Sequence, residues 1–129
     1  MLTLYHNPHS RSMIVHYMLH ELGEPFEVVP IDLQRQEHKS PDFLALNSMG
    51  KIPVLRDDDV IVTEAPAILT YLADRYPNAG LAPAIESPDR GRYLKWMFFY
   101  GSCFEPAMID ISLKRETPPS MAGWGKPAD

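Results

Sequence analysis

The chain has 129 residues, with 12 Lys and Arg against 17 Asp and Glu, which gives a formal net charge of −5. This length allows one ordinary domain, or a small domain with an appendage. The acidic balance disfavours nucleic acids and anionic membranes as partners, because phosphate groups are bound by basic surfaces. One cysteine, Cys103, excludes an internal disulfide and a multi-cysteine zinc site, and we expect a cytoplasmic protein without a metal.

The beginning of the chain predicts a strand followed by a helix. Leu2–Tyr5 is short and rich in β-forming residues, which is typical of a buried strand. Met13–Leu22 repeats apolar residues at helical spacing and is followed by Gly23, a residue common just after a helix. Ser10 and Ser12 precede this run, and hydroxyl side chains favour the start of a helix.

A second strand and a second helix follow. Phe26–Leu33 has a strand-like composition, and its Pro30 predicts an edge position because proline cannot donate a ladder hydrogen bond. Ser40, Pro41 and Asp42 predict the start of a short helix, with a capping hydroxyl, a proline in the first helical position and an acid in the first turn.

The next segments predict a hairpin and a third helix. Ile52–Leu55 and Val60–Val62 are two short β-rich runs joined by residues 56–59. Ala65–Tyr76 has helical apolar spacing and is followed by Pro77, which predicts the end of the helix. The predicted order is therefore β-α-β-α-β-β-α, a mixed sheet with helices on its faces.

A long helix is predicted after a linker. It begins near Ser87 and keeps apolar and aromatic residues at 3/4 spacing as far as Ile111. Pro106 lies within it, so we expect the helix to kink or break there. This stripe is predicted to form core and dimer surface.

Three stretches follow one another in the first part of the chain: YHNPHSRSMIVHYMLHELGEPFE, HKSPDFLALNSMGKIPVL and VTEAPAILTYLADRYP. In order and spacing they resemble the thioredoxin-like half of cytosolic glutathione transferases, with features of the bacterial, theta-like and beta-like members. The first helix of that family's all-helical half is matched by RYLKWMFFYGSCFEPAM. The resemblance implies an α/β fold, namely a thioredoxin-like β-α-β-α-β-β-α domain followed by a truncated all-α second domain.

The resemblance also implies a domain division. We expect a glutathione-binding domain at residues 1–78, a linker at 79–87, and the beginning of the helical domain at 88–129 with an irregular tail from Thr117 to Asp129. The tail has no periodic apolar pattern. We therefore expect either a truncated chain or an oligomer that covers the apolar stripe of the long helix.

The implied activity is that of a glutathione transferase. Such an enzyme joins the thiolate of its co-substrate glutathione to small hydrophobic electrophiles, a detoxification chemistry, and the family resemblance implies a homodimer. A non-catalytic, glutathione-transferase-like interaction module is the alternative, because the same fold also serves proteins without activity.

Ser10 and Ser12 are the candidates for activating the thiol. A hydroxyl at a helix N-terminus can donate a hydrogen bond to a thiolate and lower the pKa of the thiol. Counting from the first strand favours Ser10, whereas counting back from Gly23 favours Arg11 or Ser12. Tyr5 is a third possibility, and a purely structural capping role is the other reading of both serines.

The resemblance implies further contacts with glutathione. Pro53 is expected to follow a cis peptide bond, with the backbone of Ile52 pairing with the cysteinyl part of the tripeptide. Lys51 and His38 are candidates for the glycyl carboxylate, although both also suit an ordinary surface position.

The start of the third helix is the expected site for the other end of the tripeptide. Free N–H groups near Ala65 suit the γ-glutamyl carboxylate, and Glu64 suits the ammonium group. The family commonly has an acid-serine pair where this chain has Glu64 and Ala65, so Ala65 offers only its backbone.

Overall fold

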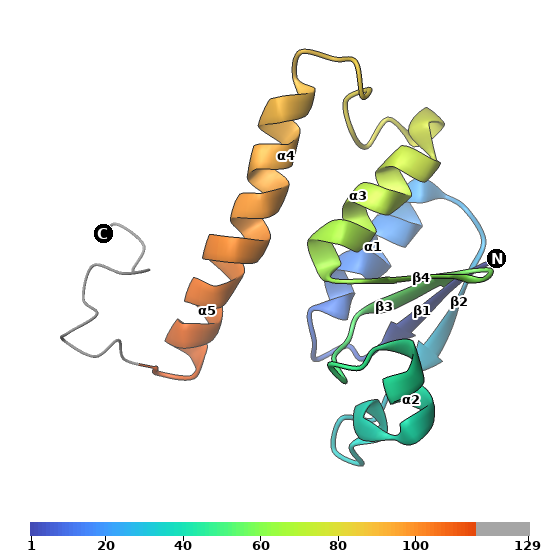
Figure 1. Ribbon diagram of the computed structural model, residues 1–129, viewed down its shortest axis with the longest axis vertical. Helices are drawn as coiled ribbons and strands as arrows, with labels where there is room; N and C mark the ends of the chain where they lie inside the picture. Colours follow the sequence, from blue (N-terminus) through green and yellow to red (C-terminus); the bar gives the residue numbers. More distant parts are fainter. Residues whose placement is uncertain (116–129) are drawn as a thin grey trace. The chain divides into compact units, whose positions relative to one another are not determined.

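The computed structural model describes residues 1–115 of the chain (Figure 1). The irregular tail predicted from Thr117 to Asp129 lies outside the described residues. The chain divides into two compact units, Met1–Ala84 and a second unit that begins at Ile85. The division falls within the segment 79–87 that the sequence assigns to a linker.

The first unit, all of whose residues are described, is built on a mixed four-stranded sheet. The strands lie in the order β2-β1-β3-β4, with β1 parallel to β2 and antiparallel to β3, and β3 antiparallel to β4. The predicted thioredoxin-like order β-α-β-α-β-β-α is confirmed. Its elements are β1 (Leu2–His6), α1 (Ser12–Leu22), β2 (Phe26–Pro30), α2 (Pro41–Leu46), β3 (Val54–Asp57), β4 (Val60–Thr63) and α3 (Ala65–Arg75), with short 3-10 turns η1 (Glu37–Lys39) and η2 (Pro77–Ala79).

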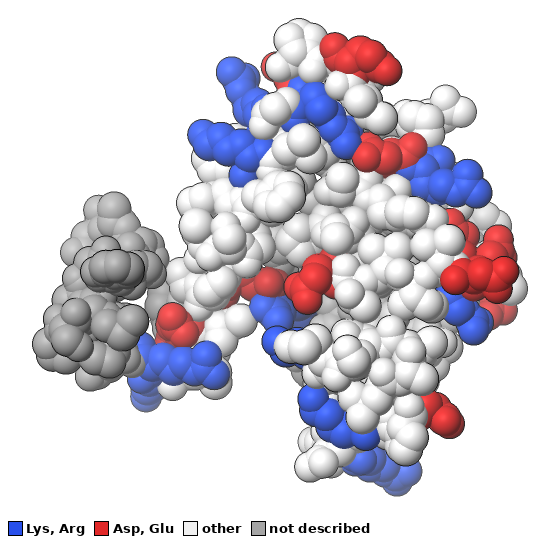
Figure 2. Space-filling model, viewed as in Figure 1, with Lys and Arg blue, Asp and Glu red and all other residues white. Residues whose placement is uncertain are grey.

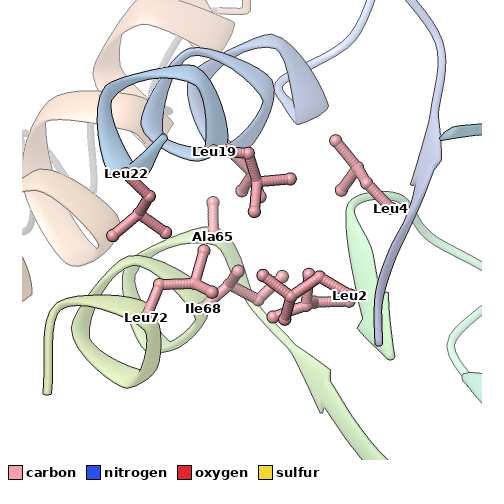
Figure 3. Packing of buried hydrophobic residues seen from close by; sticks show 9 residues of the cluster. Leu2, Leu4, Leu19, Leu22, Ala65, Ile68 and Leu72 are labelled. Carbon is pink, nitrogen blue, oxygen red and sulfur yellow. The ribbon is translucent and has the colours of Figure 1, made fainter. Parts of the chain in front are cut away.

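The buried apolar residues form two clusters that belong to the two faces of the sheet. Figure 2 shows acidic and basic side chains on the visible surface among uncharged residues, whereas Figure 3 shows leucines and an isoleucine packed against one another in the interior. Helices α1 and α3 cover one face, and the larger cluster beneath them consists of Leu2, Leu4, Val15, Leu19, Leu22, Leu55, Ala65, Ile68 and Leu72. Helix α2 supplies Phe43 to the smaller cluster, which contains Ile31 and Val54.

Burial of these side chains is the main stabilising term of the fold. Each fully buried leucine or isoleucine contributes about 1.5–3 kcal/mol relative to an exposed one. The alternation of strand residues explains the division between clusters, because successive side chains of a strand point to opposite faces. Leu4 and Leu55 therefore pack under α1 and α3, while their neighbours Tyr5 and Val54 pack toward α2.

Two strand boundaries differ from the sequence prediction. The sheet order places β2 at an edge, as Pro30 predicted, but the strand ends at Pro30 rather than Leu33. Its partner β1 ends at His6, so no strand lies beside the following residues. Strand β3 begins at Val54 rather than Ile52, because Pro53 has no N–H to offer to a ladder.

The second unit is described as far as residue 115. It contains α4 (Arg90–Phe99), the π-helical turn η3 (Tyr100–Phe104) and α5 (Glu105–Ser112). Pro106 lies in the first turn of α5. The predicted interruption therefore takes the form of a π turn just before the proline, where the wider backbone tolerates a ring that lacks an N–H. Among the described residues, no helix is both long and apolar enough to span a membrane.

Candidate active site

The register of the sheet brings three of the predicted site segments to one end of the first unit. Tyr5 in β1 lies opposite Val54 in β3, and Val54 lies opposite Thr63 in β4. The loop after β1, the turn before β3 and the segment after β4 therefore begin beside one another. These are the segments that carry the predicted Ser10, Ile52-Pro53 and Glu64-Ala65.

The loop between β1 and α1 is fixed by Asn7. Its side-chain Nδ2 donates to the carbonyl of Ile31, 2.8 Å away, and its Oδ1 accepts from the backbone N–H of His9 at 2.9 Å. The backbone N–H of Ser10 donates to the carbonyl of Asn7 at 3.1 Å. These bonds hold the loop in a tight turn that delivers Ser10 next to the start of α1.

Ser10 is half-buried and its hydroxyl is at the centre of this turn. Its Oγ accepts from the backbone N–H of Ser12 at 3.2 Å and donates to the carbonyl of Asn7 at 2.9 Å. The Oγ atoms of Ser10 and Ser12 are 2.7 Å apart. A partly exposed hydroxyl before a helix N-terminus is chemically able to donate to an anionic sulfur.

Ser12 is fully buried, with 0% of its surface exposed. Its Oγ lies 2.7 Å from Nδ1 of His6, accepts from the backbone N–H of Asn7 at 3.0 Å and is 3.1 Å from the carbonyl of Asn7. The hydroxyl is therefore enclosed by protein groups. Tyr5 is half-buried, and its ring packs edge-on against Phe43 with 5.9 Å between centroids.

His6 is a member of this cluster that sequence reasoning missed. It is buried, and its ring stacks on His16 of α1 with 4.8 Å between centroids. Burial and the neighbouring His16 lower the pKa of His6 below the ordinary value of 6.5, so the neutral imidazole is favoured. The available signal was the alternation Leu2, Leu4, His6, which continues the buried face of β1 one residue beyond the predicted strand.

The turn before β3 contains a cis peptide bond between Ile52 and Pro53. Pro53 is buried, and Ile52 is half-buried against the smaller cluster under α2. Within residues 1–115, the backbone N–H and C=O of Ile52 make no hydrogen bond. They are therefore available for strand-like pairing with an extended ligand.

Lys39 holds the segment of His38 against the turn at residue 50. Its Nζ donates to the carbonyls of Met49 and Gly50 at 3.2 and 3.0 Å. Gly50 has a φ of +57°, and a Cβ there would lie 2.7 Å from Nζ of Lys39 and 2.8 Å from the carbonyl oxygen of His38. This close approach requires glycine, and the role of Lys39 was not predicted from the sequence.

The two predicted cationic candidates differ in their surroundings. Lys51 is exposed, and its carbonyl accepts from Nδ2 of Asn47 at 2.8 Å. The Nδ1 atom of His38 is buried and has no hydrogen-bond partner among the described residues. An unpaired buried ring nitrogen costs free energy, and a ligand group able to pair with it would recover that cost.

Glu64 has an unusual backbone at the start of α3. Its φ is +70° and its ψ is +117°, and its side chain is exposed and makes no capping bond. Ala65 is buried, and Pro66 follows within the first turn. The first N–H groups of a helix lack intrahelical partners, so Ala65 and Ala67 present donors that suit a carboxylate.

A pair of histidines on α1 bears on whether the chain could hold a metal ion. His16 and His20 lie on one face of α1, with 4.7 Å between ring centroids. Among residues 1–115, no group of three or more His, Cys, Asp or Glu residues is arranged to hold a metal ion.

Comparison with known proteins gives consistent matches. Residues 1–74 match the family described as "Glutathione S-transferase, N-terminal domain". Glutathione S-transferase F10 of Arabidopsis thaliana is 34% identical over 131 residues, covering 99% of this chain and 59% of that protein. Glutathione S-transferase 3 of Zea mays is 46% identical over 89 residues, covering 67% of this chain and 40% of that protein.

Solved structures give the same match. A sphingomonad glutathione S-transferase complexed with glutathione is similar with a TM-score of 0.75 and 40% sequence identity. The alignment covers 91% of this chain and 57% of that one. The chain thus spans about half the length of the curated relatives that it matches.

Proposed function

Because the chain belongs to the glutathione S-transferase family through its N-terminal domain, we propose that it binds glutathione at the end of the sheet where β1, β3 and β4 meet. The proposal rests chiefly on one observation. The register Tyr5–Val54–Thr63 gathers a helix-start hydroxyl, an unpaired backbone segment and the N-terminus of α3 at that end.

In this proposal Ser10 is the catalytic residue that meets the sulfur of glutathione. Its hydroxyl is partly exposed, and a hydrogen bond donated to a thiolate favours the ionised form and lowers the pKa of the thiol. Ser12 is too deeply enclosed to meet the sulfur, so we assign to it the positioning of Ser10 across 2.7 Å between their Oγ atoms.

The cysteinyl and glycyl parts of the tripeptide would lie along the turn before β3. The free backbone groups of Ile52, held by the buried Pro53, pair with the cysteinyl backbone. His38 and Lys51 pair with the glycyl carboxylate. Among residues 1–115 the buried Nδ1 of His38 has no hydrogen-bond partner, which supports the first of these assignments. The ammonium of Lys51 is exposed, so its contact with the carboxylate would be screened by solvent and weaker.

The γ-glutamyl part would lie at the start of α3. Its carboxylate accepts from the free N–H groups near Ala65, and its ammonium pairs with the exposed carboxylate of Glu64. The positive φ of Glu64 supports this role, because a backbone conformation of this kind is kept chiefly where a ligand or turn requires it.

We further propose the activity and assembly that the resemblance implies. The glutathione thiolate attacks a small hydrophobic electrophile, which is a detoxification reaction, in a cytoplasmic homodimer. The exposed aromatic residues of the second unit, among them Trp96 and Phe98, support a partner surface there. Thioether formation releases the leaving group of the electrophile and needs no oxidant.

The test is glutathione binding by calorimetry together with conjugation of a chlorodinitrobenzene followed by absorbance. Ser10→Ala is expected to reduce the conjugation rate at neutral pH about tenfold to a hundredfold, because a hydrogen bond to an ionised group is lost. Binding of S-methylglutathione, which has no thiol, is expected to stay unchanged.

Ser87→Ala is the matched control. Its Oγ accepts from the backbone N–H of Asp89 at 3.2 Å, just as the Oγ of Ser10 accepts from Ser12, but it lies outside the proposed site. An absence of glutathione binding at millimolar concentration would overturn the proposal. Equal rates for the Ser10 variant and the control would remove Ser10 from its role.

A non-catalytic interaction module is the second candidate. It is favoured by Ala65, which stands where the family commonly has serine and is buried without a side-chain donor. Glutathione binding without turnover of any electrophile would support this candidate over the enzyme.

A further inference from the structure

A continuous chain of hydrogen bonds connects a buried histidine to the proposed thiol-activating hydroxyl. His6 Nδ1 lies 2.7 Å from Ser12 Oγ, which lies 2.7 Å from Ser10 Oγ. At these distances each contact must contain one hydrogen, because two facing lone pairs would repel one another. The direction of each bond therefore depends on where the hydrogens are.

Ser12 is the link that transmits this direction. A hydroxyl has one hydrogen to donate and two lone pairs that accept. One lone pair is always used, because the backbone N–H of Asn7 donates to it at 3.0 Å. Ser12 therefore has one hydrogen and one lone pair left. Three groups lie close enough to use them, namely His6 and Ser10 at 2.7 Å each and the carbonyl of Asn7 at 3.1 Å.

When Nδ1 of His6 carries no hydrogen, the hydrogen bonds are donated inward, from Ser10 to Ser12 and from Ser12 to His6. Ser12 must donate its hydrogen to Nδ1, and its remaining lone pair must accept from Ser10. The hydrogen of Ser10 is then held inside the protein. The Oγ of Ser10 then presents only a lone pair to a ligand, and this lone pair repels a thiolate.

When Nδ1 of His6 carries a hydrogen, the hydrogen bonds are donated outward, from His6 to Ser12 and from Ser12 to Ser10. His6 and the N–H of Asn7 then fill both lone pairs of Ser12, so Ser12 cannot accept from Ser10. Ser12 donates its own hydrogen to Ser10 at 2.7 Å, which is a shorter contact than the 3.1 Å to the carbonyl of Asn7. Ser10 accepts from the hydroxyl and the backbone N–H of Ser12, and its own hydrogen is free. Without a ligand that hydrogen has the carbonyl of Asn7 as its acceptor, 2.9 Å away.

Resting on the proposed function, we propose that His6 is a positioning residue whose Nδ1–H turns the hydroxyl of Ser10 outward onto the sulfur of bound glutathione. A bound thiolate in turn favours the outward direction of these hydrogen bonds, so thiolate binding and the presence of a hydrogen on Nδ1 of His6 favour one another. His6 itself does not touch the ligand in this arrangement. It acts through Ser12, which explains why an enclosed hydroxyl lies between them.

The surroundings of His6 hold its ring in place. It is buried, its backbone carbonyl accepts from Ile31, and its ring stacks on His16, which in turn meets His20 edge-on. Pro30 lies opposite on β2 and carries no charge. Since burial and His16 lower the pKa of His6, the ring is mainly neutral near pH 7, and the choice between its two neutral tautomers decides the direction.

The first test reads the tautomer directly. Nitrogen-15 chemical shifts of the imidazole in the full chain distinguish a protonated from a bare Nδ1. With glutathione bound above pH 7, Nδ1 of His6 is expected to carry a hydrogen. A bare Nδ1 in that complex would overturn the inference while leaving glutathione binding intact.

The second test measures the thiol pKa of bound glutathione by ultraviolet absorbance of the thiolate. His6→Leu removes the fixed donor, and the thiol pKa is expected to rise by about half a unit to one unit. His6→Asn, whose amide N–H can occupy the place of Nδ1–H, is expected to restore most of the shift. Binding of S-methylglutathione is expected to be the same in all forms.

His20→Leu is the matched control. His20 belongs to the same histidine group, and the ring contacts of its side chain within residues 1–115 are with His16 and Phe26, not with Ser10 or Ser12. An unchanged thiol pKa in His6→Leu, or an equal change in His20→Leu, would overturn the inference. If the unmodified chain fails to bind glutathione, the proposed function falls and this inference falls with it.

Discussion

At the scale of single residues, Glu64 stands out because its backbone is strained. A residue with a side chain at φ +70° and ψ +117° costs roughly 1–3 kcal/mol relative to a relaxed conformation. The exposed side chain makes no capping bond that would offset this cost. Strained conformations of this kind are concentrated at functional sites, which agrees with the ligand contact proposed for Glu64.

We expect Glu64→Gly to be more stable than Glu64→Ala by about 1 kcal/mol, because both lose the carboxylate but only glycine loses the Cβ that is crowded at positive φ. Both variants are expected to bind glutathione about tenfold or more weakly, since the ammonium loses its partner. Urea unfolding and calorimetry measure the two effects.

Gly23→Ala calibrates the stability comparison. Gly23 has a φ of +72°, and a Cβ there would meet nothing within 4 Å, so its alanine variant reports the conformational cost alone. An alanine variant of Glu64 as stable as the glycine variant would show that the position is not strained.

The sequence was sufficient to nominate the residues of the site, but not to predict their burial or their side-chain contacts. The pattern around Ser10, Pro53 and Glu64 is sufficient to nominate them. The enclosure of Ser12 and the participation of His6 depend on how β1 and α1 pack, with His6 one residue beyond the predicted strand. No local pattern specifies that contact.

At the scale of elements, the contact between the His38–Lys39 segment and the turn at Gly50 positions part of the proposed site. Lys39 donates to two carbonyls of that turn, and the absence of a Cβ at Gly50 lets the segments meet. The two segments are ten or more residues apart in the sequence, so a single substitution at Gly50 would act on both.

Gly50→Ala is expected to lower the free energy of unfolding by about 2 kcal/mol and to weaken glutathione binding. The Cβ would meet the backbone carbonyl of His38 at 2.8 Å, and the segment that carries His38 must shift. Chemical unfolding and calorimetry provide the measurements.

Gly80→Ala is the control for this substitution. Gly80 also has a positive φ, +67°, but its Cβ would meet nothing within 4 Å. It is expected to lose stability through backbone strain without a change in affinity. Equal affinity losses at both glycines, or no loss at Gly50, would contradict the positioning role of this contact.

Element types were predicted well where local signals agree. Ser40 caps α2 by accepting from the N–H of Phe43, as the sequence predicted, and the hairpin turns at Asp58 and Asp59. The boundaries were less predictable, because they depend on partners. Strand β2 ends where β1 ends, and the effect of Pro106 appears as a π turn rather than a break.

At the scale of the whole molecule, the second unit exposes a large apolar surface. Within residues 85–115, no side chain of α4, η3 or α5 is buried. The exposed fractions reach 72% for Phe98, 70% for Ile111 and 54% for Trp96. The sequence predicted that this stripe forms core and dimer surface, and the periodicity of the stripe could not indicate which partner surface covers it.

We expect the 129-residue chain to dimerise through this surface as its concentration rises, because burial of apolar area favours association. Sedimentation velocity measures the effect. Phe98→Glu is expected to raise the dissociation constant about tenfold or more, since a charge would have to be desolvated at the interface.

Tyr17→Glu serves as the control, because Tyr17 is 63% exposed on α1 in the first unit. It is expected to leave association unchanged. A monomer at every concentration, or equal weakening by both substitutions, would rule out a dimer formed by the second unit.

The unequal division of the core between the two faces of the sheet has a consequence for local opening. Among the described residues, nine buried side chains pack under α1 and α3, but only Ile31, Phe43 and Val54 form the cluster on the α2 side. The free energy needed to detach a segment scales with the apolar contacts it gives up, so α2 and its approach can open without global unfolding. A tripeptide bound by α3 at one end and by His38 at the other would link these two regions of unequal stability. Its binding would therefore suppress local opening most on the α2 side of the sheet, where the buried cluster is smaller.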